Sequence, residues 1–289
     1  MVLPMNIAEV GRESRIARRI PPLLIFLACS LLLFEPAFFA FSDGGKWFQV
    51  ATFIGLPLLF SALAVFVRWR RLMEYWPAFS SYVVVSIAFL LMWLLDDLPG
   101  RWLGLDPKGP PGRAVTKVSD AFILLLVVAV LGKLLRIDFD SVYLRKGRLR
   151  LGLAVGLAGF AGMAVFALVE AHTMGISSRR LLNWTPWILT FVFANGLFEE
   201  LMFRALFLRK FEPLLGAPLA NVLTGFVFAV GHAGVTYTED LLVFVALTFV
   251  FALVWGYLMQ KTGALWGSAL FHAGADTLLI IGILSGIKT

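Results

Sequence analysis

The chain has 289 residues, of which 60% are hydrophobic and 15% are charged, and its mean hydropathy is +0.88. Soluble domains carry about a quarter charged residues, so this composition excludes a soluble globular protein, a disordered chain and a collagen-like chain. The formal net charge is +7, but the excess basic residues fall in short loops between apolar runs. That placement argues against a nucleic-acid partner and indicates a membrane topology signal.

Apolar stretches long enough to cross a bilayer as helices recur along the chain. We therefore expect an all-α, polytopic transmembrane helix bundle with about nine spans, or about eight if one falls short. The expected spans are 22–41, 47–67, 77–95, 119–135, 149–171, 184–208, 218–235, 241–259 and 264–284. The single cysteine, Cys29, lies inside the first span and has no partner for a disulfide within the chain.

Basic residues gather in alternate loops, as expected when Lys and Arg stay on the cytoplasmic side. This pattern predicts a cytoplasmic N-terminus, an external C-terminus and a multi-pass protein of a cell membrane, which we take to be a bacterial inner membrane. By the positions of the charged motifs discussed below, we divide the chain into a basic N-terminal segment (1–21), five helices without a recognised motif (22–171) and a C-terminal core (184–284). The residues expected inside are Arg12, Arg15, Arg18, Arg19, Arg68, Arg70, Arg71, Lys133, Arg136, Arg145, Lys146, Arg148, Arg150, Arg209, Lys210 and Lys261.

The sixth expected span contains ionisable residues, which cost several kcal/mol in hydrocarbon and persist mainly where they pair or act. Glu200 and Arg204 are four residues apart, so on a helix they share a face and should form an ion pair. Glu199 is rotated by about 100° from Glu200 and has less direct compensation. We therefore expect Glu199 to be the freer carboxylate and a candidate general base, oriented by Asn195 one turn earlier.

The seventh and ninth expected spans each carry a histidine. Phe228 precedes His232 by one helical turn, and His272 precedes Asp276 by the same interval. Glycines beside these residues, among them Gly267, permit close approach of helix backbones. The polar faces of the three helices can therefore converge on one cavity, where Glu199 and His232 would hold and activate a water molecule.

The ordered set Glu-Glu-x-x-x-Arg, Phe-x-x-x-His and His-x-x-x-Asp on successive membrane helices resembles the CAAX-protease and bacteriocin-processing family, also called CPBP or Abi. Its relatives include the type II CAAX prenyl endopeptidases. The resemblance covers about 100 residues, from Trp184 to Leu284, and does not extend to the first five spans. It implies a glutamic intramembrane endopeptidase that cleaves membrane-associated or lipid-modified proteins or peptides.

Carried onto this sequence, the resemblance implies that Glu199 and His232 activate water and that His272 and Asp276 line the oxyanion side. Glu200 and Arg204 would brace the site or hold substrate. The prenyl-protease pattern ends in Asn, whereas this chain has Asp276. An ionised Asp cannot donate to an oxyanion, so Asp276 is either protonated or accepts from His272 and leaves that histidine as the donor.

Two other classes of function fit parts of the same pattern. Glu199, His232 and His272 could bind zinc in a metal-dependent membrane protease, although no His-Glu-x-x-His helix is present and we expect no cofactor. Buried Glu and His also occur in transporters and proton relays, but the sequence lacks their repeat symmetry. A non-catalytic membrane scaffold is the remaining alternative. The expected partners are membrane lipids and the protein or peptide substrate.

Overall fold

A computed structural model describes residues 19–42, 44–95, 98–135, 142–235 and 240–286. Within these ranges, every regular element is a helix, so the predicted all-α bundle is confirmed. Arg12, Arg15, Arg18 and Arg136, all expected inside, lie outside the described residues.

Seven stretches among the described residues are long and apolar enough to cross a membrane, which makes the chain a multi-pass integral membrane protein. They lie in helices α2 (Ile20–Ser42), α3 (Lys46–Trp69), α4 (Trp76–Leu94) with the short α5 (Leu98–Trp102), α6 (Pro110–Leu135), α7 (Leu149–Thr173), α11 (Leu241–Thr262) and α12 (Trp266–Ser285).

The two remaining expected spans are also helical but differ from a simple transmembrane helix. The first lies in α8 (Ser178–Glu199), which continues into the π-helix η2 (Glu200–Leu208) and then α9 (Arg209–Leu215). The second is α10 (Ala217–Val230), which has 14 residues and a length of about 21 Å, short of the roughly 30 Å of hydrocarbon. His232 therefore lies in the turn after α10, and the expectation that it projects from a helix is wrong.

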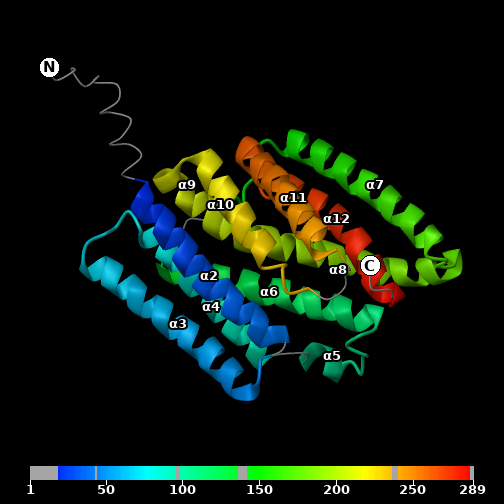
Figure 1. The fold of residues 1–289 in the computed structure, drawn as a ribbon, viewed down its shortest axis with the longest axis horizontal. Coiled ribbons are helices and arrows are strands. Elements are labelled where there is room, and N and C mark those ends of the chain that lie inside the picture. Colours follow the sequence, from blue (N-terminus) through cyan, green and yellow to red (C-terminus); the bar gives the residue numbers. More distant parts are fainter. Residues whose placement is uncertain (1–18, 43, 96–97, 136–141, 236–239, 287–289) are drawn as a thin grey trace.

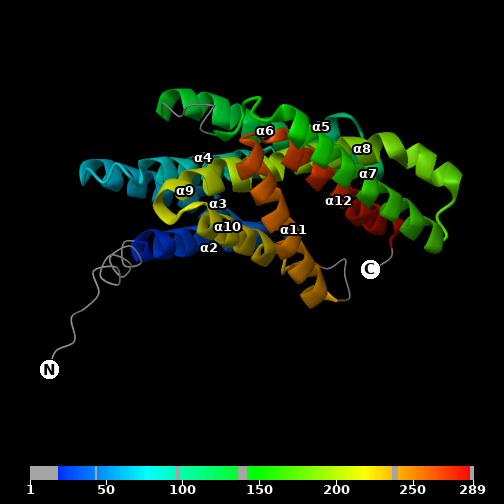
Figure 2. The same ribbon diagram turned by 90° about the horizontal axis from the view of Figure 1, so that it is seen from above.

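Two views of the bundle show that α8 starts at its edge, near the end of α7, and runs toward its centre (Figures 1 and 2). α12 packs along α7 on one side and against α8 on the other, while α6 packs against α8 and α4. α10 and α11 form an antiparallel pair that also contacts η2. The part of the sixth expected span that forms η2 is buried within the protein, which explains how it carries Glu200 and Arg204.

Aromatic side chains of the N-terminal helices buttress η2. The ring of Phe34 on α2 stacks on that of Phe203 at 4.7 Å between centroids and meets the edge of Phe207 at 5.5 Å. Tyr82 on α4 also packs on Phe207, at 4.9 Å, and its hydroxyl is hydrogen-bonded to Ser30 of α2 at 2.8 Å. The motif-free helices therefore supply one wall of the core around the segment that follows Glu199.

The segment that precedes α7 is fastened to the turn between α11 and α12. The Arg148 amide donates to the Thr262 carbonyl at 2.7 Å, and Arg145 Nε donates to the Gly263 carbonyl at the same distance. In return, the indole N–H of Trp266 donates to the Arg145 carbonyl at 3.0 Å. These bonds fix the start of α12, the helix that carries His272.

Close backbone contact between α7 and α12 depends on Gly267. A Cβ atom added at Gly267 would lie 2.6 Å from the carbonyl carbon of Gly152, closer than side chains normally approach. The obstacle is helix backbone, which cannot move aside as a flexible side chain can. Gly274, another α12 glycine, similarly faces the backbone of Phe160, as the predicted role of small residues requires.

We predict that Gly267→Ala lowers the free energy of unfolding by about 1–3 kcal/mol, because the added methyl group forces the two helices apart. Gly152→Ala is the matched control from the same contact, since its new Cβ would meet nothing nearer than 3.6 Å. Thermal unfolding of both variants in the same detergent measures the difference. Equal stability of the two variants would show that the close approach of α7 and α12 at Gly267 does not contribute to the free energy of unfolding.

Candidate active site

The predicted ion pair between Glu200 and Arg204 is present and completely enclosed. Arg204 Nη1 lies 3.0 Å from Glu200 Oε1, and both side chains have at most 1% of their surface exposed. Ser268 of α12 donates its hydroxyl to the other oxygen of Glu200. Arg204 also donates to the Ala252 carbonyl at 3.3 Å and lies over the ring of Phe228 at 4.4 Å. Glu200 is therefore occupied as a structural acceptor.

The imidazole of His272 joins the two adjacent glutamates. Its Nδ1 lies 2.9 Å from Glu200 Oε1, and its Nε2 lies 3.3 Å from Glu199 Oε2. Nε2 is also 3.6 Å from Asp276 Oδ1, and the ring stacks on Trp255 with centroids 3.8 Å apart. Ionised carboxylates only accept hydrogen bonds, so this arrangement suits a ring that donates from both nitrogens.

Asn195 does not contact the carboxylate that it was expected to orient. Its side-chain amide donates to Asp276 Oδ2 at 3.0 Å, across the interface between α8 and α12. Its own oxygen, Oδ1, is buried and has no hydrogen-bond partner among the described residues. Asn195 therefore positions Asp276, and Asp276 in turn faces His272.

His232 approaches the cluster from the turn after α10. Its Nδ1 lies 2.8 Å from the carbonyl oxygen of Phe228, which can only accept, so Nδ1 carries the hydrogen. In the neutral ring, Nε2 is then a bare acceptor. Among the described residues, Glu199 forms its ion pair with His272 and not with His232. No hydrogen bond or ion pair joins the two described groups that were expected to activate water, and of the two only His232 lines the cavity described next.

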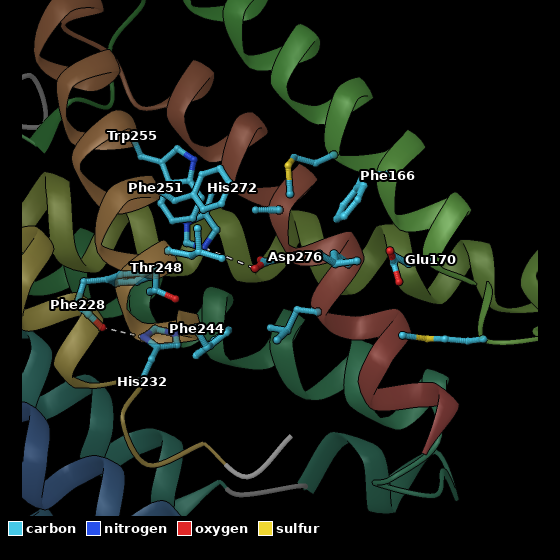
Figure 3. Close-up of a pocket in the computed structure, with 16 residues that line it drawn as sticks. Phe166, Glu170, Phe228, His232, Phe244, Thr248, Phe251, Trp255, His272 and Asp276 are labelled. Carbon is cyan, nitrogen blue, oxygen red and sulfur yellow. Dashed lines mark hydrogen bonds and ion pairs between the residues drawn. The ribbon is translucent and has the colours of Figure 1, made fainter. Parts of the chain in front are cut away.

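A cavity of about 310 Å³ lies beside these residues. Figure 3 shows His232, His272 and Asp276 at its edge, with side chains of α7, α11 and α12 around it. The rest of the wall is mainly apolar, as is usual for ligand-binding pockets that carry a few polar groups. The apolar residues that line it include Met163, Phe166, Phe244, Leu247, Phe251, Leu278 and Leu279.

Trp255 belongs to the site although the sequence gives no sign of it. Besides stacking on His272, it places its backbone carbonyl oxygen 3.1 Å from Ser268 Oγ. Its indole also lies near the guanidinium of Arg204, with the centroid at 5.6 Å. α11 is apolar along most of its length, so a tryptophan there reads as a packing residue. The role of Trp255 becomes apparent only in the packed bundle, where this face of α11 is turned toward His272 of α12.

The residues suggested for zinc do not form a ready ligand set. Among the described residues, no group of three or more His, Cys, Asp or Glu side chains is arranged to hold a metal ion. Both ring nitrogens of His272 face carboxylate oxygens, so this residue would have to give up one of these contacts to act as a ligand.

One of three comparisons with known proteins gives a match. Residues 181–278 match the family model described as "Type II CAAX prenyl endopeptidase Rce1-like". No curated protein and no solved structure matches the chain. The matched segment begins in α8 and ends within α12, so it contains the carboxylates and both histidines of the cluster.

We predict that Glu200→Gln lowers the free energy of unfolding by about 3–5 kcal/mol, because it leaves the buried guanidinium of Arg204 without its counter-charge. Asp120→Asn is the control: its pair with Lys117 is 3.9 Å long and partly exposed, so the loss should be at most about 1 kcal/mol. Thermal unfolding in lipid nanodiscs measures both. An unchanged midpoint in Glu200→Gln would contradict the importance of the pair.

Proposed function

Because residues 181–278 match the family model of Rce1-like type II CAAX prenyl endopeptidases, we propose that this chain is a glutamic-type intramembrane endopeptidase. It hydrolyses a peptide bond of a membrane-associated or lipid-modified protein or peptide. The observation that carries the proposal is the contact of His272 with both Glu199 and Glu200 at the edge of an apolar cavity. Such a site combines an acid–base group with room for an apolar substrate.

Glu199 is the better candidate for the general base. Glu200 has no exposed surface, forms an ion pair with Arg204 and accepts hydrogen bonds from Ser268 and His272, so its oxygens are already used. The side chain of Glu199 is 14% exposed, and one of its oxygens faces His272. It can therefore bind a water molecule without breaking the structural ion pair.

In the proposed reaction, Glu199 removes one proton from water while the bare Nε2 of His232 accepts a hydrogen bond from the O–H that the water keeps. The water oxygen attacks the substrate carbonyl carbon, and the carbonyl oxygen becomes an oxyanion. Protonation of Glu199 weakens its hold on the Nε2–H of His272, which can then donate to that oxyanion. Glu199 finally passes its proton to the leaving nitrogen, giving a carboxyl group and an amine.

Asp276 and Asn195 support this step through His272. Asp276 accepts from Asn195 and faces Nε2, so it holds the ring plane toward the cavity and compensates its positive charge. This assigns oxyanion stabilisation to His272 and removes the need for Asp276 to donate. Phe228 and Trp255 enclose the ring from two sides and limit its rotation.

Substrate reaches the cavity from the bilayer in this proposal, with lipids as the surrounding partner. The walls from α7 and α11 are mainly apolar, and both helices also expose apolar side chains outward. We further propose, from the loop charges alone, that the N-terminus is cytoplasmic and that the membrane is a bacterial inner membrane.

We predict that Glu199→Gln lowers kcat by about 10²-fold or more, the usual contribution of a general base, without the loss of stability expected for Glu200→Gln. His172→Gln, an exposed substitution near the end of α7, is the control for general effects on the membrane protein. The assay is mass-spectrometric detection of cleavage in a library of lipid-anchored and transmembrane peptides, with enzyme in nanodiscs. Full activity of Glu199→Gln would remove this residue from the mechanism.

We also propose that the reaction requires no metal ion, since a glutamate base and a histidine donor are sufficient for it. The expected result is unchanged peptide cleavage after exhaustive dialysis against a chelator. Elemental analysis of the same samples provides the check on metal removal. Stoichiometric zinc that is lost together with activity, and restored with it, would replace this mechanism with the metal-dependent one.

A further inference from the structure

The cavity beside His272 reaches a second ionisable group that the proposed reaction does not use. Glu170, in the last turn of α7, lines the same cavity, and Figure 3 shows its carboxylate across the cavity from His232 and to one side of Asp276. Met163, Phe166, Leu278 and Leu279 also line the wall, so apolar surface accompanies the charged groups. A lone carboxylate in such a wall can select among substrates by charge.

The surroundings of Glu170 provide little compensation for its charge. Its carboxylate lies 3.4 Å from the hydroxyl of Thr173, but that hydroxyl makes a shorter bond of 2.8 Å with the Glu170 carbonyl. No ion pair to Glu170 occurs among the described residues. The C-terminal end of a helix carries partial negative charge, so a carboxylate in the last turn of α7 is also unfavourably placed.

A bound cation would compensate both the unpaired charge of Glu170 and the partial negative charge at the end of α7. An ammonium or guanidinium group at this end of the cavity would neutralise Glu170 and interact favourably with the carbonyl end of α7. The aliphatic stem of Lys or Arg would lie along the apolar wall, which is how these side chains pack at other apolar surfaces. Apolar side chains next to this Lys or Arg in the substrate polypeptide would pack against the rest of the cavity wall.

We infer that Glu170 is a specificity-determining residue that binds a Lys or Arg side chain of the substrate polypeptide while the peptide bond to be cleaved lies beside His272 and Glu199. This inference rests on the proposed endopeptidase function and adds to it the charge of a substrate residue near the cleaved bond. Glu170 takes no part in the chemical step.

The test uses the full-length protein in nanodiscs of phosphatidylcholine, a lipid that carries no primary amine. The substrates are peptides of one apolar sequence, each with a single residue replaced by Lys, norleucine or Glu. The replaced position is varied in turn along both sides of the cleaved bond. Binding is measured by fluorescence anisotropy and cleavage by mass spectrometry. The protein variants are wild type, Glu170→Gln, Glu170→Lys and the control His172→Gln.

At one position, the wild type and His172→Gln should bind the Lys peptide about fivefold more tightly than the norleucine peptide, as expected for one partly exposed charge pair. Glu170→Gln should abolish this ratio, and Glu170→Lys should favour the Glu peptide instead. A Lys-to-norleucine ratio that is the same in wild type and Glu170→Gln at every position would overturn the inference. Charge-selective binding without any cleavage would instead contradict the proposed endopeptidase function.

Discussion

The placement of His272 between Glu199 and Glu200 is the interaction on which the rest of the site depends. Three carboxylates and one guanidinium gather in the interior of a membrane bundle, where an uncompensated charge costs several kcal/mol. A ring that donates from both nitrogens supplies a second positive charge and ties α8 and η2 to α12. Stacking on Trp255 fixes the plane in which these donors point.

The fold serves this arrangement at several levels. The π-helix η2 begins at Glu200, directly after Glu199. Short π-helical turns within α-helices occur frequently at functional sites. Gly196 lets α8 approach α12, because an added Cβ there would lie 2.8 Å from the Ala269 carbonyl oxygen. α10 ends early and delivers His232 from a turn. Each feature helps to place a polar group in the interior of the protein rather than in lipid.

Part of this site follows directly from the sequence. The ion pair of Glu200 and Arg204 needs only local helix spacing, and the order of the charged segments identified the helices that converge. The contacts of Asn195 with Asp276 and of His272 with Glu200 cross between helices, so they depend on rotations and tilts that spacing does not define. The spacing of residues along the sequence therefore identified the site residues, whereas the packing of the helices determines which of them contact one another.

The fold shows the same division. The lengths of the apolar stretches were sufficient to find most of the helices, because a helix that crosses lipid needs about 20 consecutive, mainly apolar residues. It was not sufficient to foresee the π-helical η2 or the end of α10 at Val230, since both lie inside apolar sequence that a regular α-helix would also accommodate. The role of Trp255 was hidden for a related reason, because aromatic residues are common in membrane helices.

The protonation state of His272 tests this account most directly. Solid-state ¹⁵N spectra of histidine-labelled protein in nanodiscs distinguish a ring with two N–H groups from one with a bare nitrogen, and His272→Gln assigns the signal. The account predicts that His272 is protonated on both nitrogens at neutral pH and that its signals shift in both Glu199→Gln and Glu200→Gln. A neutral His272 ring with one bare nitrogen, unaffected by either substitution, would contradict it.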